Sequence, residues 1–174
     1  MSVFERRKGG VRNKTYIVMG TGRSGTSFIV DCLMNNGVDM GRRSGGAFHH
    51  NLENIEFRKL NTDILKSAGG DAFHPPTIKA VLEQKKKYRK RARELIKKYK
   101  ADLWGFKDPR TTLALPAYIN EFKGDVYFIC MVRRLSKVTE SIINNNTSRI
   151  RGIDAKELAR KYINSMIYLI RHFS

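Results

Sequence analysis

The chain has 174 residues, of which 41% are hydrophobic and 29% are charged. That length suits one domain spanning residues 1–174, and it is too short for two comfortable ones. No stretch approaches the ~20 apolar residues that a membrane-spanning helix needs. Residues 1–14 are polar and basic and lack the apolar stretch of a signal peptide, so we expect a flexible N-terminus on a cytoplasmic protein.

The net charge is +18, from 34 Lys and Arg against 16 Asp and Glu, and it favours anionic partners. Nucleic acid, a phosphonucleotide, an acidic glycan and a membrane surface all fit this charge. Cys32 and Cys130 lie far apart within apolar runs, and we expect both to be buried free thiols. Two cysteines at this spacing argue against a disulfide framework and against a zinc site.

The first elements are a strand and a helix. Thr15–Met19 is short, β-branched and apolar, which predicts a buried strand. A glycine-bearing turn follows, and Thr26–Met34 is then apolar at helical spacing, with a stop signal at Gly37. One face of this helix is predicted to carry Phe28, Ile29, Cys32 and Leu33.

The remaining elements follow from apolar spacing and turn residues. In chain order they are a loop over 42–50, helices over 52–65 and 78–99, a strand over 103–106, a helix over 113–122, a strand over 126–132, and helices over about 136–143 and 155–173. The strand over 126–132 is apolar throughout, which is typical of a central strand covered on both faces. Alternating strands and helices predict an α/β fold, with a central parallel sheet flanked by helices.

The turn after the first strand reads Gly20-Thr21-Gly22-Arg23-Ser24-Gly25-Thr26-Ser27, and we call it the glycine loop. Glycines let backbone N–H groups approach an anion, and the start of the next helix adds partial positive charge. Gly20, Gly25 and Ser27 match the ATP-type loop G-x-x-x-x-G-K-[ST], but Thr26 stands at its lysine position. Arg23 is the nearest cation. The pattern favours an anion-binding loop over a plain glycine turn, and it argues against an ATPase.

The glycine loop after an apolar strand resembles the 5′-phosphosulfate loop of sulfotransferases, which use 3′-phosphoadenosine 5′-phosphosulfate (PAPS). In that family an arginine ends a later strand, a serine follows eight residues on, and both bind the 3′-phosphate; Arg133 and Ser141 match them. Trp104–Arg110 resembles the K-D-P-R segment of bacterial and carbohydrate-type members, and Leu52–Asn61 is loosely similar to their acceptor-side helix. The resemblance covers about residues 15–145 and implies a P-loop-type three-layer sandwich.

The resemblance implies sulfuryl transfer from PAPS, without a metal, to a hydroxyl or amine acceptor, of which a carbohydrate is one option. The residues that match the family's cofactor-binding positions are Gly22, Arg23, Ser24, Gly25, Thr26, Ser27, Arg133 and Ser141. Lys107 matches a lysine that stabilises the leaving phosphate. Pro109 stands where many cytosolic members have a histidine base, so we expect a carboxylate base, Asp108 or Glu53, with His49 and His50 behind them.

Structural alternatives stand beside these roles. Lys107, Asp108 and Arg110 also suit a salt-bridged turn, and Glu53 suits the surface of a helix. Many sulfotransferases have a later glycine- and basic-rich loop that closes over the 3′-phosphoadenosine. The present sequence has no such loop after its last predicted helix, so we expect weaker nucleotide binding.

Residues 85–100 contain ten Lys or Arg and one Glu. Such a run is usually a solvated helix face, and its excess of one sign also suits an anionic acceptor. Two rival functions stay open. One is a P-loop nucleotide kinase-like enzyme, against which the missing lysine argues. The other is a non-catalytic basic module that binds nucleotide or nucleic acid, although no aromatic stacking motif supports it.

Overall fold

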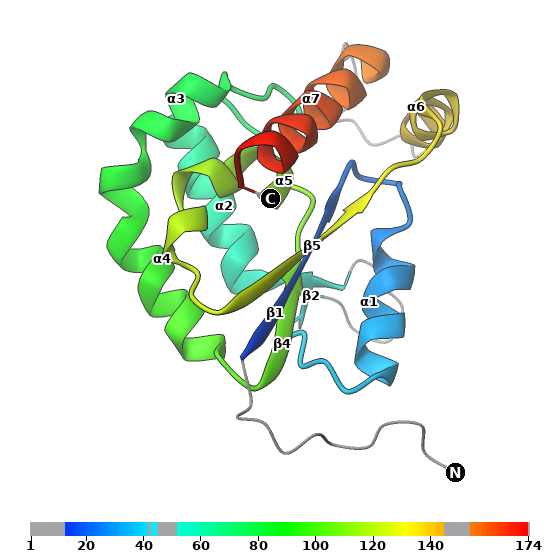
Figure 1. The fold of residues 1–174 in the computed structure, drawn as a ribbon. Coiled ribbons are helices and arrows are strands. Elements are labelled where there is room, and N and C mark those ends of the chain that lie inside the picture. The colour runs from blue at the N-terminus through cyan, green and yellow to red at the C-terminus, as the bar shows by residue number, and fades with distance from the viewer. Residues whose placement is uncertain (1–12, 42, 45–51, 145–153, 174) are drawn as a thin grey trace.

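The computed structural model describes residues 13–41, 43–44, 52–144 and 154–173 (Figure 1). Its centre is a three-stranded parallel sheet in the order β4-β1-β5. The strands are β1 (Lys14–Gly20), β4 (Leu103–Lys107) and β5 (Asp125–Met131). Helices flank the sheet, so the predicted α/β class with a parallel sheet is confirmed.

Helices and turns make up most of the remaining described chain. They are α1 (Thr26–Asn35), α2 (Ile55–Ser67), α3 (Ile78–Glu83), α4 (Lys85–Tyr99), α5 (Thr111–Ala114), α6 (Leu135–Asn144) and α7 (Ala155–Phe173), with the 3-10 turns η1 (Leu115–Ala117) and η2 (Ile119–Glu121). A short antiparallel pair joins β2 (Arg43–Ser44) to β3 (Glu53–Asn54). None of the described helices is both long and apolar enough to cross a membrane.

The two faces of the sheet bury alternate side chains of β1, as strand geometry requires. Val18 belongs to a small core with Val30 of α1, whereas Ile17 and Met19 belong to a larger core. The larger core is built with side chains of α2, α4 and α7. In Figure 1, α1 accordingly lies to the right of the sheet, and α2 and α4 lie to its left.

Stacked aromatic rings join α2 to β4 in the larger core. The rings of Phe57 and Phe106 lie 3.6 Å apart, centroid to centroid, and Trp104 and Phe122 lie 6.2 Å and 6.1 Å from Phe106. Burying a ring of this size contributes about 1.5–3 kcal/mol. The stack fixes the start of α2 against the end of β4; Glu53 of β3 lies just before α2, and Lys107 ends β4.

Helix α2 begins at Ile55, although the sequence predicted a helix from Leu52. The side chain of Asn54 accepts hydrogen bonds from the backbone N–H groups of Glu56 and Phe57, both at 3.1 Å, and so caps the helix. Glu53 therefore lies on β3 and not on a helix surface.

Two further predicted helices are also wrong in extent. The one predicted over 78–99 is two helices, α3 and α4, which meet at Gln84. The one predicted over 113–122 is α5 followed by η1 and η2, because Pro116 has no N–H to continue an α-helical ladder.

The prediction that the strand over 126–132 is central is wrong as well. β1 occupies the centre, and its last four residues are fully buried or nearly so. β5 lies at one edge of the described sheet, and each of its residues is at least partly exposed. The apolar composition of β5 therefore does not indicate a central position in the sheet.

Three side chains are more exposed than predicted. Phe28 was expected on the buried face of α1, but it is 69% exposed. Cys32 and Cys130 are free thiols as predicted, but both are only partly buried. His49, His50 and most of residues 1–14 lie outside the described residues.

Candidate functional site

The glycine loop joins the C-terminal end of β1 to the N-terminus of α1. Gly25 precedes the helix with φ of 93°, and Arg23 adopts φ of 71°, so the loop turns through the left-handed region twice. At Gly20, a Cβ would lie 2.6 Å from the backbone oxygen of Met131 and 2.8 Å from Oγ of Ser24, which only glycine avoids. The loop shape therefore depends on its glycines.

The side chain of Thr112, which lies shortly after the K-D-P-R segment, holds the start of the loop. The hydroxyl of Thr112 accepts a hydrogen bond from the N–H of Gly20 at 3.0 Å and lies 3.3 Å from its carbonyl oxygen, to which it donates. Within the loop, Oγ of Ser24 donates to the carbonyl of Thr21 at 2.7 Å. The loop is thus fixed at its base, and its C-terminal end leads into the positively polarised N-terminus of α1.

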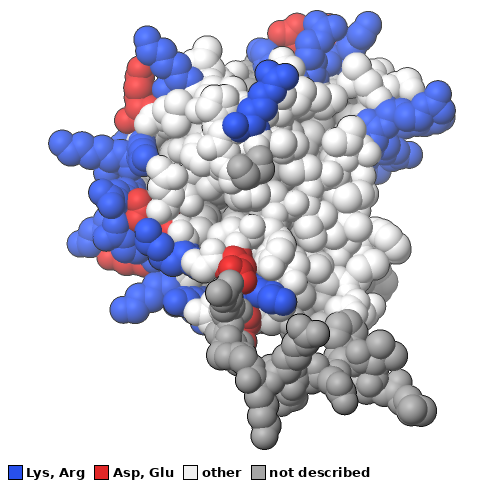
Figure 2. Space-filling view, in the orientation of Figure 1, with Lys and Arg blue, Asp and Glu red and all other residues white. Residues whose placement is uncertain are grey.

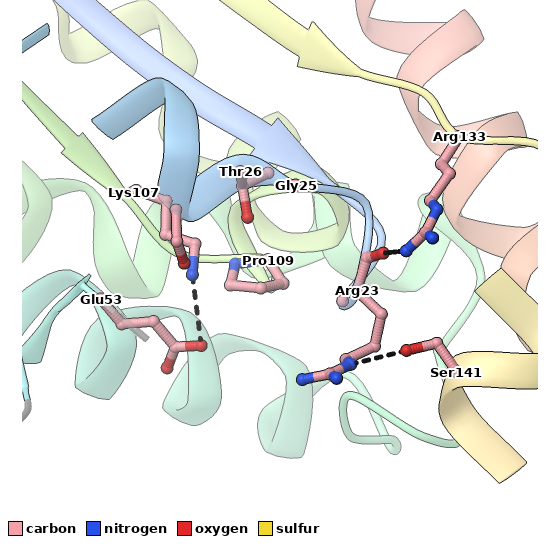
Figure 3. A pocket seen from close by; sticks show the side chains of 10 residues that line it. Arg23, Gly25, Thr26, Glu53, Lys107, Pro109, Arg133 and Ser141 are labelled. Carbon is pink, nitrogen blue, oxygen red and sulfur yellow. Dashed lines mark hydrogen bonds and ion pairs between the residues drawn. The ribbon is translucent and has the colours of Figure 1, made fainter. Parts of the chain in front are cut away.

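A cavity of about 450 Å³ lies against the loop (Figure 3). The residues that line it are Gly22, Arg23, Gly25, Thr26, Ser27, Glu53, Lys107, Pro109, Arg133 and Ser141. Of the sequence-predicted site residues that the structure describes, only Ser24 and Asp108 are not among them. The cavity therefore brings together the glycine loop, β3, the end of β4, the residue Arg133 after β5, and α6. It lies at the C-terminal edge of the parallel sheet, where ligands of such folds bind.

Arg23, Arg133 and Ser141 contact one another on one side of the cavity. Nε of Arg23 donates to Oγ of Ser141 at 2.9 Å, and Nη1 of Arg133 donates to the backbone oxygen of Arg23 at 3.1 Å (Figure 3). A neighbouring cavity of about 390 Å³ shares these residues and adds Lys137, Glu140 and Asn144 of α6. Two guanidinium groups and a hydroxyl thus gather at the edge of the loop, although Arg23 is more than a hundred residues from Arg133 and Ser141 in sequence.

Lys107 and Glu53 lie on the other side of the cavity (Figure 3). The Nζ of Lys107 is 3.8 Å from Oε1 of Glu53, and the Lys107 side chain is only 4% exposed. Burial lowers the pKa of Lys107, and the charges of Glu53 and Asp108 offset part of that effect. Two further cations approach Glu53 from outside, Arg110 at 3.4 Å and Arg58 at 3.8 Å.

Asp108 is fully buried beneath this cation group. Its Oδ1 accepts from the backbone N–H of Arg110 at 3.0 Å and from Nη1 of the same residue at 2.7 Å. Its Oδ2 accepts from Nδ2 of Asn61 at 3.2 Å, and Asn61 in turn accepts from the hydroxyl of Tyr118 at 2.8 Å. The geometry of Asp108 is therefore that of the salt-bridged turn that the sequence allowed.

The sequence reasoning missed three contributors to the site. Arg58 faces Glu53, Lys137 borders the neighbouring cavity, and Thr112 fixes Gly20. Arg58 and Lys137 follow predicted site residues by less than two helical turns, and that proximity is the signal that would have found them. Thr112 has no local signal, because its partner lies 92 residues away.

Comparisons of the chain with protein-family models, with curated proteins and with solved structures found no match. The chemistry of the site therefore rests on its geometry. Loop amides and a helix N-terminus attract anions, and the cationic side chains of Arg23 and Arg133, with Lys107 beside Glu53, line the same space. Among the described residues, no group of three or more His, Cys, Asp or Glu is placed to hold a metal ion.

Proposed function

We propose that the chain is a PAPS-dependent sulfotransferase with a P-loop-type three-layer fold. The observation that carries this proposal is that the glycine loop, Lys107, Arg133 and Ser141 line one cavity, although they come from separate segments. Those residues match the sulfotransferase pattern in the sequence. A cavity with cations at both ends suits a nucleotide with phosphate groups at both its 5′ and 3′ positions.

The donor set fits such a nucleotide. The amides at the start of α1, with Arg23, Thr26 and Ser27, would hold the 5′-phosphosulfate, as helix N-termini hold anions generally. Arg133 and Ser141 would hold the 3′-phosphate. The positive φ values of Gly25 and Arg23 shape the backbone into the concave turn that brings amides toward one anion.

PAPS, when bound, supplies the sulfuryl group and a phosphate leaving group. The acceptor oxygen or nitrogen forms a bond to sulfur, while the bond from sulfur to the phosphate oxygen breaks and its electron pair stays on that oxygen. Lys107, at the end of β4 and 3.8 Å from Glu53, would stabilise the negative charge that develops on that oxygen. The acceptor's proton goes to a carboxylate of this chain.

Between the two candidate bases, the geometry favours Glu53. Its carboxylate lines the cavity, whereas Asp108 is buried and accepts three hydrogen bonds from Arg110 and Asn61. We therefore assign proton transfer to Glu53. Asp108 then positions Arg110, which reaches Glu53 at 3.4 Å.

The test is thermal unfolding and calorimetry with adenosine 3′,5′-bisphosphate, compared with Mg-ATP. We expect the bisphosphate to raise the unfolding temperature, because a ligand that binds only the folded state stabilises it. Mg-ATP should give a smaller shift. No stabilisation by the bisphosphate far above micromolar concentration would refute the proposal, and a preference for Mg-ATP with ATP turnover would favour a kinase-like enzyme.

Two arginine variants sharpen this test. Arg133→Ala should weaken the bisphosphate by about tenfold to a hundredfold, since a charge-assisted hydrogen bond contributes about 1.5–3 kcal/mol, while adenosine 5′-phosphate should lose little affinity. Arg134→Ala is the matched control, because Arg134 is its exposed neighbour and does not line the cavity. Equal losses for the two ligands would show that Arg133 does not bind the 3′-phosphate.

A further inference from the structure

The charge of the molecule is unevenly distributed. Figure 2 shows a central area without Lys, Arg, Asp or Glu, while charged side chains lie at the left, along the right margin, across the upper part of this face and below its centre. In the same orientation, Figure 1 shows β5 and α7 at the front of this face and α1 and α6 to its right. An uncharged face is unexpected on a chain with a net charge of +18.

Exposed apolar side chains gather on the elements that form or border this face. The exposed large hydrophobic residues of the described chain are Phe28, Ile55, Tyr127, Val132, Ile143, Ile167 and Ile170. All but Ile55 belong to α1, β5 and its next residue, α6 or α7. Phe28, Val132 and Ile143 are each more than 60% exposed. Concentrated exposure of this kind marks interaction surfaces, whereas scattered single residues do not.

The two edge strands of the described sheet, β4 and β5, differ in what pairs with their outer edges. Along β4, a bridge covers the edge, because the N–H of Asp39 donates to Leu103 at 3.0 Å and its carbonyl accepts from Gly105 at 2.8 Å. No described strand pairs with the outer edge of β5. Between Asp125 and Arg133, β5 also lacks the charges and prolines that normally protect a free edge.

We propose that the outer edge of β5 pairs antiparallel with β5 of a second copy of this chain, around a two-fold axis at Ile129. Such pairing would extend the sheet to six strands. A two-fold axis that passes through the edge perpendicular to the sheet makes the two β5 strands antiparallel and gives both copies the same contacts. We expect this dimer to form without bound nucleotide.

The sequence of β5 is self-complementary in this register. The uncharged segment Val126–Val132 is centred on Ile129, so each of its residues faces an uncharged residue of the other copy. The register also brings Asp125 of one copy opposite Arg133 of the other, where the charges are opposite. A shift by two residues would instead place charged residues against the apolar segment.

Charge also decides between a second copy and another kind of partner. An acidic partner would be attracted to the basic residues of α4 and not to an uncharged face. Two copies of a chain with +18 repel each other, and an uncharged face is where they can approach at the lowest electrostatic cost. Val132, which directly follows β5, would then be covered by the other copy.

The test is sedimentation equilibrium of the protein without nucleotide. We expect a mass twice the 20.0 kDa of one chain at micromolar concentrations. Val132→Lys should weaken the dimer at least about tenfold, because it places an unpaired charge in the contact. Ile55→Lys, an exposed residue away from this face, is the matched control and should leave the dimer intact. Circular dichroism and thermal unfolding check that both variants fold.

A cross-link tests the axis itself. Directly opposite residues in an antiparallel pair have Cα atoms ~4.5–5.5 Å apart, within reach of a disulfide. In a chain with Cys32 and Cys130 replaced by serine, Ile129→Cys should therefore form a disulfide-linked dimer under mild oxidation. Lys123→Cys should not, because two such residues would lie ~40 Å apart at ~3.3 Å per residue. A protein that is monomeric at all concentrations overturns the proposal. So does a dimer that Val132→Lys does not weaken and that Ile129→Cys does not cross-link.

Discussion

Thr112 connects the two halves of the candidate site. Its hydroxyl is buried and hydrogen-bonds to both the N–H and the carbonyl of Gly20, the first residue of the glycine loop. Thr112 itself lies in α5, directly after the Lys107–Arg110 segment. One side chain thus sets the distance between the loop and the cation group around Glu53.

Replacing Thr112 with valine should loosen this connection. Thr112→Val keeps the shape but leaves the buried N–H and carbonyl of Gly20 without the hydroxyl, so we expect the free energy of unfolding to fall by about 1–3 kcal/mol. The bisphosphate should also bind more weakly, because the loop loses its fixed position. Urea unfolding and calorimetry measure the two effects.

Thr112→Ser is the control for this prediction, since it keeps the hydroxyl and removes only a methyl group. It should bind the bisphosphate nearly as well as the unmodified chain. If the valine and serine variants lose the same affinity, the hydroxyl does not position the loop, and the methyl group accounts for the effect of the residue.

How far the site follows from sequence depends on whether its residues are local. The glycine loop was predicted from its strand–loop–helix pattern, and Arg133 and Ser141 were predicted from their resemblance to the sulfotransferase spacing; residues of all three line one cavity. The burial of Asp108 was not predictable, because it depends on Asn61 and Tyr118 from other elements. The contacts in the structure, and not the spacing in the sequence, therefore distinguish Glu53, which lines the cavity, from Asp108, which is buried.

At the scale of elements, α4 is held to the core by a buried carboxylate. Glu121 is only 5% exposed, and it accepts from Nε of Arg89 at 2.8 Å and from Nε and Nη2 of Arg93 at 3.0 Å and 2.8 Å. Arg91 and Lys98 also pair, with Asp63 and Glu56 of α2. Part of the basic run therefore attaches the helix, and the rest is solvated as the sequence suggested.

Glu121 should make stability depend on pH. Burial raises the pKa of Glu121, but hydrogen bonds and charges from Arg93 and Arg89 outweigh it, so the pKa lies below its ordinary value. A carboxyl with a lowered folded-state pKa stabilises the fold at pH above its unfolded-state value of ~4.3, and the contribution is lost as pH falls through the folded-state pKa. Glu121→Gln should therefore lower the free energy of unfolding at neutral pH and have progressively less effect in acid.

Urea unfolding at neutral and acidic pH measures this difference. Glu157→Gln is the control, because its pair with Lys161 is exposed and 3.6 Å long, and such pairs contribute little. A constant difference between the Glu121→Gln variant and the unmodified chain down to the most acidic pH would mean that the variant acts through packing and not through charge.

The elements themselves show where local patterns are sufficient. β1, β4, α1 and α7 were predicted within a few residues, because apolar spacing and glycine stops are local properties. The cap at Asn54 and the 3-10 turns around Pro116 were missed because apolar residues continue through both places. The edge position of β5 was missed because an apolar composition indicates that a strand is covered, but does not show which element covers it.

At the scale of the whole molecule, charged and apolar surfaces are separated. The basic residues of α4 lie on the left of the molecule, and the uncharged face is centred on β5 (Figures 1 and 2). This separation allows one chain to attract anions on one side and to associate through another. The two kinds of binding should then respond to salt in opposite directions.

Raising the salt concentration should strengthen the dimer. Between about 0.1 M and 1 M, the Debye length falls from ~10 Å to ~3 Å, so the repulsion between two chains of +18 is screened, while an uncharged contact gains nothing from low salt. Binding of a polyanion such as heparin to α4 should weaken over the same range, because it depends on ion release. Sedimentation equilibrium and heparin-affinity elution measure the two trends. A dimer that dissociates as salt rises would instead be held mainly by ion pairs, and the apolar segment Val126–Val132 would then not be its main contact.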